Sequence, residues 1–116
     1  MSFDPGPYAA HYRAENEEEK RRTRSRYDAA LEEARNLARR IKETDSSVRG
    51  VILFGSMAEG VPRNPDFDID IALDGGDVYR AMDVTDESPY EVDVVELRLL
   101  PPHVRKRILD KGIVLQ

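Results

Sequence analysis

Three aspartates at particular spacings are the residues of this chain best suited to chemistry. Asp68 and Asp70 flank Ile69 in a segment where acidic and apolar residues alternate, so on a β-strand both carboxylates would point to one face, with Cβ atoms roughly 6.5–7 Å apart. Two like charges at that separation repel each other, and a hard divalent cation between them makes the arrangement favourable. Because surface strands often carry alternating acids, this pair alone is weak evidence for a metal site.

Asp93 is the third of these aspartates and strengthens the metal hypothesis. It lies among Val92, Val94 and Val95 in a second alternating segment, where an acid is expensive to bury without a partner. If the two segments are neighbouring strands, three carboxylates converge. Carboxylates, waters and substrate phosphate oxygens are the ligands that Mg²⁺ prefers, so the sequence predicts a magnesium site; the alternative interpretation is a set of solvated strand acids.

Gly55 and Ser56 follow a continuous apolar run, residues 51–54. A glycine lets the backbone approach another group closely, and a Ser hydroxyl with exposed N–H groups at the end of a strand suits a phosphate. Taken alone, Gly-Ser after a strand usually marks only a turn. Together with three acids it has the layout of a two-metal phosphoryl-transfer site.

Periodicity predicts the elements that must hold these residues. Apolar residues recur at helical spacing, and Asn16 followed by Glu19 resembles a capping signal, so we expect a long helix over about 16–44. The later segments predict an α+β or α/β sheet with helices. We expect strands at 51–54, 66–73, 91–97 and 113–115, a short helix within 77–88, and a last helix from Pro101-Pro102 to Lys111, capped by Gly112.

The chain of 116 residues has the length of a single domain. Residues 1–12 hold Pro5, Gly6 and Pro7 and are expected to form an irregular arm. Residues 13–116 would then form the domain, with the long helix over 13–44 and the sheet and its helices over 45–116. Residues 13–26 carry no large apolar side chain; an extended solvated helix is the simplest interpretation, and a dimer or a partner contact stays open.

Composition excludes several classes of protein. Without cysteine, a disulfide scaffold, a thiolate zinc site and a cysteine nucleophile are impossible. No apolar run approaches a membrane span and the N-terminus has no secretory layout, so we expect a cytoplasmic protein without membrane contact. The net charge of −5 disfavours extended nucleic-acid binding. Eleven acids against one base in residues 66–96 indicate either a solvated acidic surface or a bound cation.

The run Gly55-Ser56, eleven residues, Asp68-Ile69-Asp70 and then Asp93 resembles the minimal nucleotidyltransferases of the DNA polymerase beta-like superfamily. The similarity extends over roughly residues 51–115 and includes the apolar VILF segment before Gly55 and the closing stretch PPHVRKRILDKGIVLQ. The resemblance implies a mixed β-sheet flanked by helices. It also implies magnesium, with two ions, and a nucleoside triphosphate, most often ATP. Many relatives are antitoxins that add AMP to a tyrosine of a partner HEPN-type toxin.

Site roles also follow from the resemblance. Asp68 and Asp70 would hold both metal ions, and Asp93 would bind the ion that activates the acceptor hydroxyl. Gly55 and Ser56 would contact the leaving triphosphate. The function expected is transfer of AMP from ATP to a hydroxyl of a protein partner. Asp66, on the same acidic face, is interpreted as a loop or strand-edge residue that could assist the metal.

The chain departs from the family pattern after Ser56. Many relatives have Arg-Ala-Arg-Gly there, whereas this chain has Met57-Ala58-Glu59-Gly60, so two cations near the triphosphate are missing. Arg63 is the candidate to compensate. The departure leaves open an antitoxin that neutralises its partner by binding alone. Transfer to a small molecule or an RNA end is a third hypothesis, and so short a chain has little room for an acceptor domain.

Overall fold

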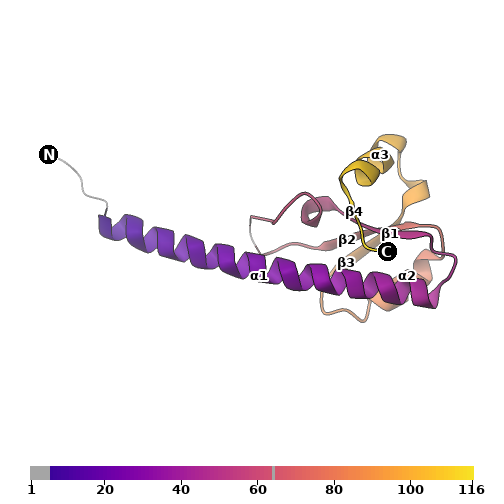
Figure 1. Ribbon diagram of the computed structural model, residues 1–116, viewed down its shortest axis with the longest axis horizontal. Coiled ribbons are helices and arrows are strands. Elements are labelled where there is room, and N and C mark those ends of the chain that lie inside the picture. Colours follow the sequence, from indigo (N-terminus) through magenta and orange to yellow (C-terminus); the bar gives the residue numbers. More distant parts are fainter. Residues whose placement is uncertain (1–5, 64) are drawn as a thin grey trace.

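The computed structural model describes residues 6–63 and 65–116, and its side chains from residue 16 onward outside that gap. A four-stranded sheet is flanked by helices, and the first helix, α1, runs along the sheet and far beyond it (Figure 1). The molecule therefore measures 70 × 31 × 17 Å. In chain order the elements are α1 (Gly6–Thr44), β1 (Gly50–Phe54), the 3-10 turn η1 (Gly55–Met57), β2 (Ile69–Asp74), α2 (Val78–Thr85), β3 (Val92–Glu96), the 3-10 turn η2 (Leu97–Leu99), α3 (Pro102–Lys111) and β4 (Ile113–Val114).

The sheet has the strand order β3-β2-β1-β4 and is mixed. β1 is antiparallel to β2 and to β4, whereas β2 and β3 run parallel. Parallel neighbours need a crossover, and α2 supplies it between β2 and β3. This architecture confirms the expected α+β fold with a small mixed sheet and a long N-terminal helix.

Alternation along the strands divides the sheet into two apolar faces. Val51 and Leu53 of β1 pack with Ile69, Ile71 and Leu73 of β2 in the main core, which the buried stripe of α1 covers. The other face is smaller: Ile52, Ala72, Leu97 and Ile108 form a second cluster beneath α3. Figure 1 shows α1 and α3 on opposite sides of the sheet. Side chains of even number in β1 and β2 thus share the face with α3.

The predicted apolar stripe of α1 is confirmed at its C-terminal half. The apolar residues at helical spacing in this half are Tyr27, Leu31, Ala34, Ala38 and Ile41. Leu31 is partly buried and the other four are buried. Ala30 and Leu37 are also fully buried, so the stripe is wider than expected. A 39-residue helix spans about 58 Å, which explains why its N-terminal half projects past the sheet.

The expected start of this helix is wrong. It begins at Gly6, so Asn16 is no cap and the irregular arm expected for residues 1–12 is wrong for residues 6–12; residues 1–5 lie outside the described residues. Pro7 falls in the first turn, where its missing N–H group removes no helical hydrogen bond. The proline pattern therefore marks the beginning of the helix rather than a segment that precedes it.

Asp45 joins the end of α1 to the start of α2. Its buried carboxylate accepts hydrogen bonds from the backbone N–H groups of Ser47 at 3.0 Å and Asp77 at 2.8 Å. Asp77 in turn caps α2 by accepting from the N–H of Tyr79 at 2.9 Å. The two backbone N–H groups, more strongly than any other influence, lower the pKa of Asp45.

Candidate active site

Asp70 and Asp93 lie side by side on the parallel strands β2 and β3, in direct register. Phe54 of β1 pairs with Asp70 from the other side, so the three residues form one row across the sheet. The neighbouring row, Ile52, Ala72 and Val95, lies under α3. The two carboxylates therefore stand on the α3 face, one row beyond the apolar cluster that α3 covers.

Asp68 lies immediately before β2 rather than within it. The strand begins at Ile69, so the strand expected over 66–73 starts three residues late, and Asp66 and Asp68 are exposed residues of the approaching loop. Asp68 still influences Asp70. Partial burial raises the pKa of Asp70, and the charges of Asp93 and then Asp68 raise it further. The site is thus a patch of mutually repelling carboxylates.

Gly55 brings the end of β1 against this patch. Its φ of +74° is a conformation that favours glycine, and a Cβ at this position would collide with Oδ2 of Asp70. Ser56 follows in η1 and is exposed. The Gly-Ser turn and the central carboxylate are therefore in close contact, as a site that holds a phosphate beside a cation requires.

Tyr27 of α1 fixes the position of this turn from the face of the sheet that α1 covers. Its hydroxyl donates a hydrogen bond to the buried carbonyl oxygen of Met57 at 2.9 Å, and its ring meets Phe67 edge to face with centroids 6.4 Å apart. Met57 is fully buried. The long helix thus anchors both η1 and the loop that leads into β2. The sequence shows Tyr27 as an apolar stripe member and gives no signal of this second role.

Arg63 does not line the pocket that contains Gly55. It is exposed and lines a hollow against the solvent-extended part of α1, beside Asn16 and Lys20. The pocket that contains Gly55 is lined instead by Arg107 and Lys111 of α3. Sequence reasoning assigned no site role to these two cations; their four-residue spacing, which puts them on one side of a helix, was the only available signal.

The donor set suits magnesium, because all three candidate ligands are carboxylates with hard oxygen atoms. Among the residues with described side chains, no three Asp, Glu or His residues are already gathered closely enough to hold an ion. Because like charges repel, convergence of these carboxylates is unfavourable until a cation lies between them. In such a site Asp70 and Asp93, fixed in register, would supply the rigid part, and Asp68 on the loop would supply the adjustable part.

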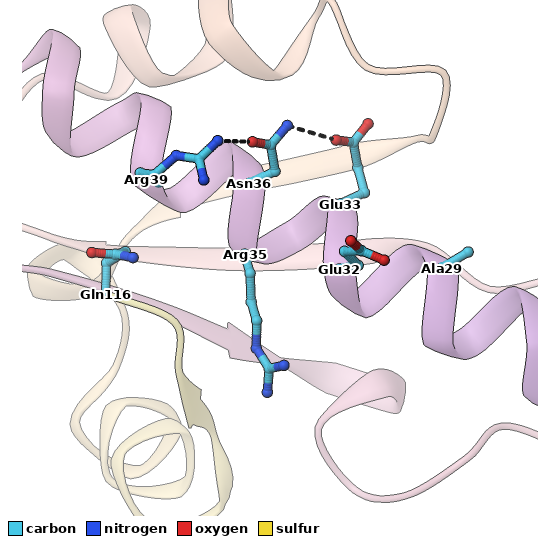
Figure 2. Close-up of a pocket in the computed structure, with 7 residues that line it drawn as sticks. All are labelled: Ala29, Glu32, Glu33, Arg35, Asn36, Arg39 and Gln116. Atoms are coloured by element: carbon cyan, nitrogen blue, oxygen red, sulfur yellow. Dashed lines mark hydrogen bonds between the residues drawn. The ribbon is translucent and has the colours of Figure 1, made fainter.

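A wider hollow lies elsewhere, beside α1 and the C-terminal residue Gln116 (Figure 2). Figure 2 shows Arg39, Asn36 and Glu33 joined by hydrogen bonds along α1. None of the candidate site residues lines it. Its open, charged walls belong to the surface of the helix and lie apart from the candidate carboxylates. None of the helices, within the described residues, combines the length and apolar character of a membrane span.

Comparison with known proteins agrees with this geometry. The family model described as "Polymerase beta, Nucleotidyltransferase" matches residues 36–116, which include the candidate carboxylates and the Gly-Ser turn. Among solved structures, one chain from a crystal structure of a mutant of the toxin–antitoxin pair MntA–HpeT is similar, with a TM-score of 0.55, 19% identity and coverage of 71% of each chain. At that identity the likeness shows the fold alone. No curated protein matches the chain. With its family model extending over most of the sequence, the chain belongs to the polymerase beta nucleotidyltransferase family.

Proposed function

We propose that this protein is a magnesium-dependent nucleotidyltransferase that moves AMP from ATP onto a hydroxyl of a protein partner. The observation that carries the proposal is the row in which Asp70 and Asp93 stand in register, with the backbone of Gly55 packed against Asp70. This arrangement puts the carboxylates and the Gly-Ser turn at one end of the sheet. A cytoplasmic antitoxin role, with a tyrosine of a HEPN-type toxin as acceptor, is the specific form we propose.

The chemistry follows from where these groups lie. The acceptor hydroxyl attacks the α-phosphorus of ATP in line; the new phosphorus–oxygen bond forms as the bond to pyrophosphate breaks, and the hydroxyl proton passes to Asp93. Asp68, Asp70 and Asp93 would hold the magnesium ions, which neutralise charge on the phosphates when bound. Gly55 and Ser56 orient the leaving phosphates through backbone and hydroxyl groups. The contribution of the protein is mainly positioning and preorganised electrostatics.

The partner assignment is supported by the fold likeness to a toxin–antitoxin structure. That chain comes from a mutant with two Asp-to-Glu substitutions two positions apart, the same spacing as Asp68 and Asp70 here. Adding AMP to a tyrosine of the toxin would replace a neutral hydroxyl with a bulky anion and so change the surface on which that tyrosine lies. The projecting half of α1 (Figure 1) offers surface for such a partner or for a second copy of the chain.

A labelling experiment tests the activity. The protein, magnesium, ATP labelled at the α-phosphate and the product of the neighbouring gene are incubated together, and transfer of label is followed on a gel. We expect label on the partner with the wild type and loss of at least a hundredfold with Asp68→Asn. Asp74→Asn is the matched control, since Asp74 lies at the other end of β2 and pairs with Arg49. Equal labelling by Asp68→Asn would overturn the site assignment.

A second candidate is an antitoxin that acts by binding alone. The observation that favours it is Glu59, which stands where many relatives carry a cation and pairs with Arg107 at 2.6 Å. An Asp68→Asn/Asp70→Asn double variant separates the two candidates. If this variant suppresses the toxicity of the partner as fully as the wild type at equal expression, occlusion is the function. If suppression is lost while the complex still forms, transfer is the function.

A further inference from the structure

A small pocket lies between the Gly-Ser turn and α3, on the same face of the sheet as the carboxylates. Gly55, Ala58 and Glu59 form one wall, and Arg107 and Lys111 form the other. Its volume of about 120 Å³ is well below the roughly 300–1,000 Å³ of pockets that enclose whole ligands. Only part of a ligand fits, and the remainder must lie outside.

The position of the pocket determines which part of the nucleotide it would hold. Gly55 borders the pocket and also packs against Asp70, so the pocket opens directly beside the carboxylates. In the proposed reaction the α-phosphorus lies at the carboxylates, and the atoms next to it are the ribose on one side and the leaving phosphates on the other. The lining of the pocket is mostly apolar, but Arg107 and Lys111 bring two cations to it, and these favour the phosphates over the ribose.

Glu59 controls the charge of this pocket. Its Oε1 accepts a hydrogen bond from the Arg107 guanidinium at 2.6 Å, across 48 residues of chain, and the Arg107 side chain is otherwise 71% exposed. An exposed pair of this kind is weak. A polyphosphate carries more negative charge than one carboxylate and accepts bidentate hydrogen bonds from Arg, so it displaces Glu59 from Arg107.

We propose that Arg107, with Lys111, binds the leaving β- and γ-phosphates, and that Glu59 holds Arg107 in place and competes with the nucleotide for it. This inference rests on the proposed function and deepens it. Many relatives carry two cations after Ser56 that this chain lacks. The inference assigns their role to Arg107 and Lys111 of α3, on the other side of the pocket. Arg107 and Lys111 are therefore positioning residues for the leaving group, and Glu59 sets the affinity for nucleoside triphosphate.

Calorimetric titration of the whole protein with magnesium present tests the assignment, with ATP, AMP and inorganic pyrophosphate as separate probes. Arg107→Gln should weaken binding of ATP and of pyrophosphate by about tenfold each and leave AMP unchanged, because AMP lacks both phosphates. Glu59→Gln should tighten ATP binding, and this gain should shrink in the Arg107→Gln background. Arg98→Gln is the matched control: Arg98 is as exposed and pairs with Glu96, but it does not line the pocket.

The outcomes separate this inference from the proposed function. Equal ATP and pyrophosphate affinities for the wild type and Arg107→Gln overturn the inference alone. A loss of AMP affinity equal to that of ATP, with pyrophosphate unchanged, also overturns it, because Arg107 would then contact the nucleoside. If the wild type binds neither ATP nor pyrophosphate, the proposed function and the inference fall together. Thermal unfolding of each variant shows whether the fold is intact; the Arg107 side chain is 71% exposed and that of Glu59 is 42% exposed.

Discussion

Asp70 and Asp93 occupy paired positions on adjacent parallel strands, about 4.8 Å apart across the sheet. Nothing in the apolar cores requires two acids there. The charge of Asp93 contributes to raising the pKa of Asp70, so the ionised pair is a destabilising element of the fold. Such sites persist in proteins where activity depends on them.

Because Asp70 and Asp93 repel each other, we expect that removing one of these two charges stabilises the metal-free protein. A carboxylate whose folded pKa is raised binds protons more tightly in the native state, so its ionisation lowers stability as pH rises through that pKa. At pH 7 in the presence of EDTA, Asp70→Asn should therefore raise the melting temperature by a few degrees. Asp74→Asn should not, because Asp74 is paired with Arg49 at 2.9 Å.

Magnesium should make the wild type more stable than Asp70→Asn, which reverses the order of their melting temperatures in EDTA. A ligand that binds only the native state raises its stability by mass action, and the wild type keeps the carboxylate that Asp70→Asn lacks. Thermal scans with increasing magnesium should show a larger rise for the wild type than for Asp70→Asn. Identical rises in both proteins would mean that Asp70 holds no metal ion.

Gly55 should tolerate no side chain. Gly55→Ala combines an unfavourable φ with a collision against Asp70, so we expect loss of nucleotidyl transfer and a lower free energy of unfolding. Gly60→Ala is the matched control: φ is +115°, but among the described residues no atom other than those of its chain neighbours lies within 4 Å of the added Cβ. It should cost only the backbone strain of about 1–2 kcal/mol and keep activity. If both variants are equally active, the contact between Gly55 and Asp70 has no catalytic importance.

Replacement of Tyr27 should lower both the free energy of unfolding and the affinity for ATP, although Tyr27 does not belong to the carboxylate patch. Tyr27→Phe leaves the buried carbonyl of Met57 without the hydrogen bond it receives at 2.9 Å, a loss of about 1–3 kcal/mol. Because η1 also carries Ser56, we expect a weaker apparent affinity for ATP. Tyr79→Phe, at a position that is 74% exposed, should change neither quantity. Chemical denaturation and nucleotide titration measure the two effects, and an unchanged ATP affinity in Tyr27→Phe would separate α1 from the site.

Asp45 should account for part of the acid sensitivity of the fold. The backbone N–H groups of Asp77 and Ser47 lower its pKa in the folded protein below the ordinary value of an Asp carboxyl, so its stabilising effect is complete above the unfolded pKa and is lost as pH falls through the folded pKa. Asp45→Asn should have a lower free energy of unfolding than the wild type at pH 7. This difference in free energy should become smaller below about pH 4. Denaturant titrations at pH 7 and pH 3 measure it; a constant difference would contradict the assignment.

Local patterns in the sequence were sufficient to predict the elements of the sheet. Continuous apolar residues identified β1, alternation identified β2 and β3, and the prolines before His103 identified the start of α3. Each is a signal carried by neighbouring residues. The start of α1 was not predictable in this way, because Pro5-Gly6-Pro7 is typical both of an irregular arm and of a first helical turn.

The contacts that assemble the site depend on register and on long-range packing, which local pattern does not contain. The sequence suggested that Asp93 joins Asp70 if the strands are neighbours, and only the β2–β3 register gives their direct pairing. The Glu59–Arg107 pair spans 48 residues, and the four-residue spacing of Arg107 and Lys111 is a weak signal that does not connect either cation with Gly55. Arg63, close to Ser56 in sequence, lies instead against α1.

Intact-mass spectrometry of the partner tests the central claim most directly. The neighbouring gene's product is purified after co-expression with the wild type and, separately, with Asp68→Asn. The account predicts a mass increase of one or more AMP units with the wild type, none with Asp68→Asn, and fragmentation that places the AMP on a tyrosine. An unmodified partner in both samples, bound to either form and silenced by both, would contradict nucleotidyl transfer as the function of this protein.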